Sequence, residues 1–213
     1  MTEIKKRILS SIGILLLIII SSYNNTFLGL VSIFVFFQLF YEFLNIYKKI
    51  INKNKVHLYF VLFFTLLYLL ACLILIWSII VGNLSSEKIY LYIIIITCMS
   101  SDIGGFTFGK LFKGKKLTKI SPNKTYSGVI GSYILSFIAV YSIFDLNISI
   151  NKILLFTFII SSISQLGDLI VSILKRKAKV KDTGNLIPGH GGLLDRLDGY
   201  IFAIPFGILI SYI

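Results

Sequence analysis

Long apolar runs constrain this chain of 213 residues more than any other feature of its sequence. A helix needs about 17–25 mostly apolar residues to cross the hydrocarbon core of a bilayer. Inside lipid every backbone N–H and C=O must be paired within the structure, which favours helices. The sequence therefore predicts an all-α fold, a polytopic integral membrane helical bundle of about seven transmembrane helices. The expected spans are roughly 8–22, 27–46, 57–81, 89–108, 128–144, 153–174 and 199–213.

The composition agrees with this class of protein. Charged residues make up 14% of the chain and hydrophobic residues 56%, whereas soluble domains carry roughly 25% charged residues. We therefore expect a single transmembrane domain over residues 1–213 with no soluble domain. Its N-terminal spans, within 1–88, carry few polar residues and no evident role, and the polar motifs lie in 89–213.

The basic residues are distributed very unevenly between the two sides of the predicted spans. Nineteen of the 21 lie before span one or in the loops that follow spans two, four and six, and only Lys88 and Lys152 lie on the opposite side. By the positive-inside rule the N-terminus and these loops face the cytoplasm, and the C-terminus lies outside. The net charge of +12 could suggest nucleic acid, but in a membrane protein the distribution of charge is more informative than its sum. We expect an integral protein of the cell (plasma) membrane and no nucleic-acid partner.

Span six carries a polar stripe. Its members recur every three or four residues and so share one face of a helix: Gln165, Asp168, Ser172, and Lys175 or Arg176. A carboxylate at membrane depth is costly and usually faces an internal cavity or a partner. Two interpretations stay open, a structural polar seam between helices and a metal ligand beside a phosphate-binding cation.

The loop after span six combines glycines with acids and cations. Residues 188–192 read Pro-Gly-His-Gly-Gly, and such glycines let the backbone approach a ligand and aim N–H groups at an anion. Asp195 and Asp198 follow and share a face if they are helical. They could also simply favour a helix start. Arg196 between them could neutralise a phosphate or pair with an acid.

Each of these fragments is weak alone, but their order closely resembles the signature of the phosphatidate cytidylyltransferases, also called CDP-diacylglycerol synthases. The signature occupies 172–198, and the resemblance covers roughly 97–200. It includes Asp102 with the glycines after it, and Lys124 in a Ser-Pro-x-Lys-Thr segment. In one departure, Ser127 stands where the family usually carries glutamate.

The resemblance implies transfer of a cytidylyl group from CTP to phosphatidate, giving CDP-diacylglycerol and pyrophosphate in phospholipid biosynthesis. It implies CTP, phosphatidate and the lipid bilayer as partners, a homodimer as one allowed assembly, and Mg²⁺ or another divalent cation as cofactor. It makes 89–213 the catalytic half, with an active site that faces the cytoplasm.

The resemblance also implies roles for single residues. The metal ligands would be Asp168, Asp195 and Asp198, which with Lys175 and Arg176 form the catalytic set. The substrate-binding set would be Lys124, Ser172, Lys181, Asp182, His190, Gly191, Gly192 and Arg196.

Two other functions remain open at this stage. One is a CTP-dependent polyprenol or phytol kinase, which belongs to a related membrane family and would phosphorylate a lipid alcohol. The other is a degenerate, non-catalytic membrane protein, such as a transporter or scaffold, and Ser127 is its only support.

Overall fold

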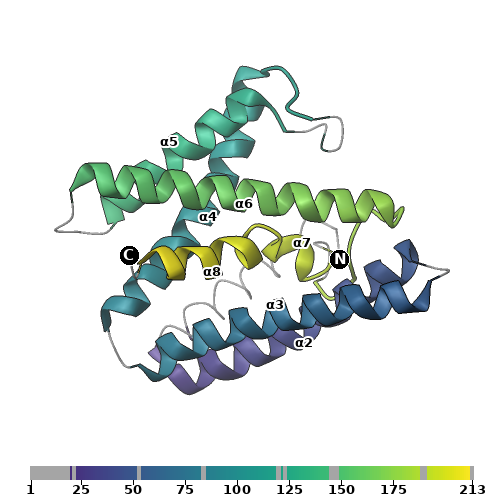
Figure 1. The fold of residues 1–213 in the computed structure, drawn as a ribbon. Helices are drawn as coiled ribbons and strands as arrows, with labels where there is room; N and C mark the ends of the chain where they lie inside the picture. The colour runs from purple at the N-terminus through teal and green to yellow at the C-terminus, as the bar shows by residue number, and fades with distance from the viewer. Residues whose placement is uncertain are drawn as a thin grey trace, which may run out of the picture. The chain divides into compact units, whose positions relative to one another are not determined.

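The computed structural model describes residues 20, 23–51, 54–82, 85–118, 121, 124–143, 149–187 and 191–211. Within these ranges the regular structure is helical, and β-pairing is limited to two isolated bridges. Five described helices are long and apolar enough to cross a membrane, so the predicted all-α membrane bundle is confirmed (Figure 1). They are α2 (Asn25–Ile50), α3 (Lys55–Val81), α4 (Ser85–Phe112), α5 (Tyr126–Ile143) and α6 (Ile150–Lys177).

The predicted count of seven spans is not confirmed. Helix α8 (Tyr200–Ser211) has 12 residues and contains Pro205, so it is about 18 Å long, whereas the hydrocarbon core is about 30 Å thick. The first predicted span, 8–22, lies almost wholly outside the described residues. The outward placement of the C-terminus stays a prediction.

The chain divides into two compact units. The first, called here the N-terminal unit, comprises Met1–Asn83 and Leu174–Leu197, and includes the short helix α7 (Leu194–Leu197). The second, called here the central unit, comprises Leu84–Ile173 and Asp198–Ile213. We call the segment between α6 and α7, residues 178–193, the signature loop. It belongs to the same unit as α2 and α3. The assignment of separate roles to 1–88 and 89–213 stays a prediction.

In the N-terminal unit, α2 and α3 lie side by side as a helical hairpin (Figure 1). Asn24 and Asn54 begin the two helices, because their side chains accept hydrogen bonds from free N–H groups of the first turns. Towards the end of the hairpin that lies away from the α2–α3 connection, Trp77 of α3 donates a hydrogen bond from Nε1 to Oγ of Ser32 in α2 over 3.2 Å. The Trp77 ring lies against Gly29, where an added Cβ would come within 3.2 Å of it.

In the central unit, α4 and α5 pack backbone against backbone. A Cβ at Gly104 of α4 would overlap the carbonyl oxygen of Gly131 in α5, and one at Gly128 would lie 2.7 Å from the carbonyl oxygen of Gly105. Small residues permit this approach, and in lipid such packing takes the place of the hydrophobic effect.

Buried hydroxyl groups join the helices of the central unit as well. Ser132 of α5 donates to the carbonyl oxygen of Ser101 in α4 over 2.7 Å. Ser101 and Ser161 of α6 share a hydrogen bond of 2.8 Å. These bonds satisfy polar groups that lipid could not.

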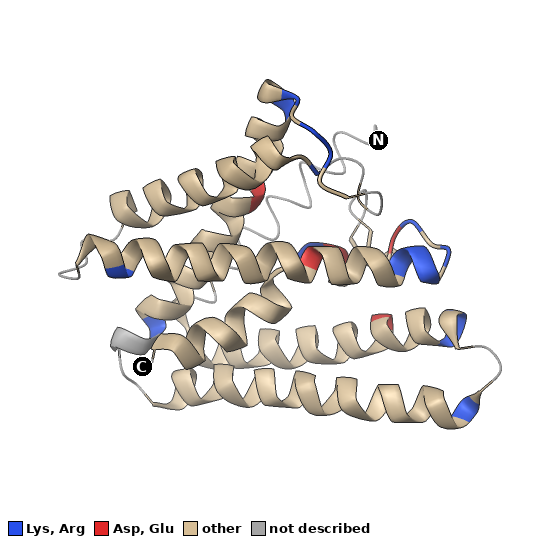
Figure 2. Cartoon of the chain, turned by 45° about the horizontal axis from the view of Figure 1, so that its top comes forward, with Lys and Arg blue, Asp and Glu red and all other residues tan. Residues whose placement is uncertain are grey.

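The helix surfaces fit a lipid environment. Many exposed side chains are large and apolar, among them Phe60, Phe63 and Ile74 on α3. Figure 2 shows Lys and Arg mostly at helix ends and in loops, with few charges along the helices. Lys48 and Lys49 close α2, for example, and Lys110 lies in the last turn of α4.

Candidate functional site

The central unit brings together two signature aspartates. Asp168 lies on α6, and Asp198 lies just before α8; their side chains are joined by a hydrogen bond. Gly167 and Gly199 make this possible. A Cβ at Gly167 would lie 2.7 Å from the carbonyl oxygen of Asp198, and one at Gly199 would overlap Oγ of Ser164 on α6. We call Asp168 and Asp198 the carboxylate pair.

The pKa of Asp198 is raised to about 8. The first cause is burial, which penalises the charged form, and the second is the negative charge of Asp168 beside it. Asp102 of α4 also lies within electrostatic range and acts in the same direction. Three acids that sequence analysis selected therefore influence each other in this unit.

A cation already lies at one side of the carboxylate pair. Nζ of Lys124 is 2.6 Å from Oδ2 of Asp168 and donates to the carbonyl oxygen of Gln165 over 3.3 Å. Ser172, one turn further along α6, donates from Oγ to Oδ1 of Asp168 over 3.3 Å. The side chains of Lys124 and Asp168 are 22% and 33% exposed, so the cluster remains open to a ligand.

The chemistry of the carboxylate pair fits a hard divalent cation. Magnesium prefers carboxylate oxygens and keeps several waters, and two carboxylates held together would gain from a positive charge between them. The described residues contain no group of three or more acidic, His or Cys side chains arranged to hold a metal. Two of the three predicted ligands, Asp168 and Asp198, thus lie together in this unit, and the predicted third, Asp195, belongs to the other unit.

Asp195 lies in the N-terminal unit and is fully engaged by protein donors. Nζ of Lys175 donates to its Oδ1 over 2.8 Å. The backbone N–H groups of Thr183 and Gly192 donate to its Oδ2 over 2.7 and 2.9 Å. Burial alone would raise the pKa of Asp195, but these donors outweigh burial and lower it. Its predicted role as a metal ligand stays a prediction.

Sequence analysis missed one acid that the structure makes prominent. Glu42 of α2 is 1% exposed, and its oxygens accept hydrogen bonds from the backbone N–H groups of Leu193 and Leu194 over 2.8 and 2.9 Å. The hydroxyl of Thr183 lies 2.5 Å from Glu42 and 3.0 Å from Asp195. We call Glu42, Thr183 and Asp195 the loop clamp.

A simple signal could have found Glu42. It is the only acidic residue between positions 4 and 86, and it lies within an apolar run. An acid inside a membrane span is by itself a reason to expect a functional or structural partner. The residues around Glu42 match no motif, so motif spacing alone does not single it out.

The remaining predicted site residues differ in their surroundings. Gly191 has a φ of 85°, which strongly favours glycine, and it pairs with Ile187 in a short bridge. His190 lies outside the described residues. Those with exposed side chains are Arg176, Lys181, Asp182 and Arg196.

Ser127, the residue at the family's glutamate position, lies at the start of α5. Its Oγ accepts a hydrogen bond from the backbone N–H of Gly114 over 3.3 Å and shares one of 3.1 Å with Thr125. Both partners flank the loop that carries Lys124. The Ser127 hydroxyl therefore links the two ends of this loop, Gly114 and Thr125.

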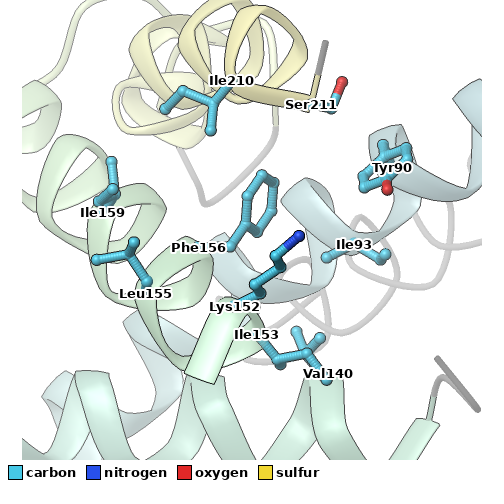
Figure 3. Close-up of a pocket in the computed structure, with 10 residues that line it drawn as sticks. All are labelled: Tyr90, Ile93, Val140, Lys152, Ile153, Leu155, Phe156, Ile159, Ile210 and Ser211. Atoms are coloured by element: carbon cyan, nitrogen blue, oxygen red, sulfur yellow. The ribbon is translucent and has the colours of Figure 1, made fainter. Parts of the chain in front are cut away.

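The central unit also holds a pocket of about 430 Å³, drawn in Figure 3. Its walls are mostly apolar, and the ammonium group of Lys152 points into it. Lys152 precedes Asp168 by sixteen residues on the same helix, α6, so the two lie about 24 Å apart along the axis. The pocket is therefore separate from the carboxylate pair.

Comparison with known proteins gives a consistent result. A family model described as "Cytidylyltransferase family" matches residues 1–213. A phosphatidate cytidylyltransferase of Staphylococcus saprophyticus is 47% identical over 109 residues, which are 49% of this chain and 42% of that protein. One of Bacillus subtilis is 41% identical over 122 residues, 55% of this chain and 45% of that protein. The matched region covers less than half the length of these relatives.

Proposed function

Because the chain belongs to the cytidylyltransferase family, we propose that it transfers the cytidylyl group of CTP to phosphatidate. The products are CDP-diacylglycerol and pyrophosphate. The observation that carries the proposal is the cluster of Asp168, Asp198 and Lys124, which joins paired carboxylates to a cation beside membrane-spanning helices. Two relatives named phosphatidate cytidylyltransferase support the choice of lipid.

The proposed reaction is a displacement at phosphorus. A phosphate oxygen of phosphatidate attacks the α-phosphorus of CTP, and the bond from that phosphorus to the bridging oxygen of the β-phosphate breaks. Pyrophosphate leaves with the bonding electrons. The attacking oxygen is already anionic, so no strong general base is required. The main obstacles are the approach of two anions and the charge on the leaving group.

The residues of the cluster suit these two tasks. Lys124 can pass from Asp168, 2.6 Å away, to an incoming phosphate, because an ammonium group rotates freely among acceptors. The exposed cations Arg176, Lys181 and Arg196 belong to the N-terminal unit, and their role as phosphate contacts is proposed from the motif alone. Ser172 helps to fix Asp168 by its hydrogen bond of 3.3 Å.

We also propose Mg²⁺ or a similar divalent cation as the cofactor. Asp168 and Asp198 would hold it, because their paired oxygens match the ligands this ion prefers. When bound, it would neutralise charge on the triphosphate and on leaving pyrophosphate. In its absence the two carboxylates repel each other, and a proton shared between them relieves the repulsion.

We further propose that the site faces the cytoplasm in the plasma membrane. The support is the concentration of basic residues at one set of helix ends, as in the last turns of α2, α4 and α6. The test replaces Cys72 and Cys98 and then labels single cysteines in intact cells. Lys113→Cys should stay unlabelled by an impermeant reagent, and Lys152→Cys should react; the reverse pattern would contradict this orientation.

The chemical function is tested with two forms of radiolabelled CTP. Purified protein is given phosphatidate, Mg²⁺ and CTP labelled at either the α- or the γ-phosphorus. The α-label should enter the lipid product and the γ-label should appear in pyrophosphate. A kinase would instead place the γ-label in a lipid alcohol and release CDP.

The assay needs one variant and one substrate control. Asp198→Asn should give no α-labelled lipid while it remains monodisperse in detergent. Diacylglycerol or a polyprenol in place of phosphatidate should give no product. Transfer of the γ-label to either alcohol would replace the proposed function by the kinase, and no transfer at all would support a non-catalytic protein.

A further inference from the structure

The most extensive hydrogen-bond network in the described residues lies outside the carboxylate pair, around Glu42. We propose that Glu42 is a positioning residue that fixes the signature loop in the shape that binds CTP. The inference rests on the proposed function, and it assigns a task to the N-terminal helices, which carry no signature residue. Glu42 touches no reacting atom in this proposal and acts only through the loop.

The first argument is the pattern of donors around the carboxylate. Oε1 accepts from the N–H of Leu193 and Oε2 from the N–H of Leu194. The side chain of Gln38, one turn earlier on α2, donates to Oε1 over 2.9 Å. Two successive backbone amides are thus held by one side chain, which defines the backbone path between the glycine turn and α7.

The second argument is the link to Asp195 through Thr183. The Thr183 hydroxyl lies between the two carboxylates, 2.5 Å from Glu42 and 3.0 Å from Asp195. Its own N–H donates to Asp195, as does the N–H of Gly192. The hydrogen bonds of the loop clamp therefore hold two separate segments of the loop, one at Thr183 and one at residues 192–194, at its junction with α7.

The third argument is the close approach of glycines. A Cβ at Gly192 would overlap both Thr183 and Glu42, and one at Gly184 would come within 3.1 Å of Oε1 of Glu42. Glycine at both positions is thus explained by contact with this carboxylate. The same segment contains Gly191, whose N–H is a candidate for phosphate contact once the backbone is held.

Because each oxygen of Glu42 faces a different backbone N–H, glutamine is a diagnostic replacement. An amide offers one acceptor oxygen, so its NH₂ group must oppose either Leu193 or Leu194. A buried N–H without an acceptor costs free energy, so the backbone around it should open to solvent more often. Glu42→Asp keeps both oxygens but is one carbon shorter, and it should rescue part of the function that Glu42→Gln loses.

The experiment measures amide hydrogen exchange and steady-state kinetics on the full-length protein in detergent with added lipid. In Glu42→Gln the amides of Leu193 and Leu194 should exchange at least about tenfold faster, while those of α5 stay unchanged. The KM for CTP should rise by about 10–100-fold, with a smaller change in kcat. Thr183→Val should act in the same direction.

Ser32→Ala provides the matched control on the same helix. It removes the hydrogen-bond acceptor for Trp77 but lies ten residues from Glu42, about 15 Å along α2. It should leave the loop amides and the KM for CTP unchanged. Glu42→Leu serves as a second removal of the carboxylate, with no amide to oppose the loop.

Several results would overturn the inference. Unchanged exchange at Leu193 and Leu194 in both Glu42→Gln and Glu42→Leu would remove Glu42 as the anchor. Equal acceleration in α5 would make it a general stabiliser, and faster loop exchange with an unchanged KM for CTP would separate the loop from the nucleotide. If wild-type protein transfers no cytidylyl group, the proposed function fails, but the exchange data still decide whether Glu42 holds the loop.

Discussion

The loop clamp and the carboxylate pair contain aspartates that are only three residues apart in the chain, Asp195 and Asp198. Their surroundings are nevertheless opposite. Asp195 faces a lysine and backbone N–H groups, which lower its pKa. Asp198 faces a second carboxylate, and burial together with that neighbour raises its pKa to about 8. The donors around Asp195 favour its charged form, whereas burial and Asp168 favour the protonated form of Asp198.

The difference shows that residue spacing alone does not assign roles within a motif. Sequence analysis grouped Asp168, Asp195 and Asp198 as equivalent ligands because all three are acids in one ordered signature. The donors around each carboxylate distinguish them. Asp195 accepts bonds from Lys175 and two backbone N–H groups, whereas Asp168 and Asp198 share a hydrogen bond with each other. The metal-ligand role of all three stays a prediction.

The largest expected effect comes from Asp198→Asn. The amide keeps the shape but removes a charge that a divalent cation requires, so turnover should fall by about 10²–10³-fold or more. Thermal stability without metal should stay equal or rise, because asparagine is uncharged beside Asp168 without having to bind a proton. Activity and melting temperature measured with and without Mg²⁺ check both expectations; a near-normal rate in a folded variant would remove Asp198 from the site.

Asp195→Asn should act differently, chiefly on stability. An asparagine must direct its NH₂ group at Lys175 or at the N–H groups of Thr183 and Gly192, so the loop loses partners on one side. We expect a loss of roughly 2–4 kcal/mol in the free energy of unfolding. Urea denaturation followed by tryptophan fluorescence measures it. Equal stability combined with lost Mg²⁺ binding would restore Asp195 as a metal ligand.

The pH dependence of the loop follows from the lowered pKa of Asp195. A lowered folded-state pKa stabilises the protein above the unfolded value, near 4, and this contribution is lost as the pH falls through the folded-state pKa. Exchange of the Thr183 and Gly192 amides, corrected for intrinsic rates, should therefore stay slow from pH 7 to 5 and accelerate below about pH 4. In Asp195→Asn this acid-induced change should be absent.

A smaller effect is expected at Lys124. Lys124→Ala removes the cation beside Asp168 and should lower kcat/KM by about tenfold or more. Lys49→Ala, in the exposed last turn of α2, should change it less than about twofold, because we expect that lysine to act only as a topology signal. Equal, small effects at both positions would take the loop before α5 out of the site.

The smallest expected effect is that of Ser127→Glu. If the family's glutamate orients Lys124 or a metal-bound water, restoring it should raise turnover or Mg²⁺ affinity by up to about tenfold. If Asp102 has taken over that role, the added charge should lower the rate instead. Turnover against Mg²⁺ in Ser127→Glu, Asp102→Asn and the double variant separates the two. No change in either background would show that position 127 lies outside the site.

Much of the fold could be predicted because lipid allows few solutions. The five long helices agree with the predicted spans to within a few residues at each end, since apolar length and basic flanks determine where helices cross. The predicted span at 199–213 is not confirmed, because an apolar sequence does not distinguish a full crossing from a short packed helix. Here α8 is a helix of 12 residues.

The candidate site could be predicted only in part. The ordered motif identified Asp168, Asp198 and Lys124, which the structure brings together within one unit. It could not identify Glu42, because Glu42 acts through contacts with residues about 140–150 positions later in the chain. Such long-range pairing depends on tertiary structure, and the local pattern around Glu42 is simply an apolar helix with one acid.

The glycine contacts between α4 and α5 have a consequence for how the protein tolerates purification. At Gly104 the backbone of α4 touches the carbonyl oxygen of Gly131, so the pair is held by van der Waals contact, together with the hydrogen bond from Ser132 to Ser101, and not by exclusion of water. Replacing lipid tails with detergent tails hardly changes that contact. We expect the contact between α4 and α5 to survive extraction into detergent. Gly131→Ala, in contrast, should separate the two helices in lipid and in detergent alike.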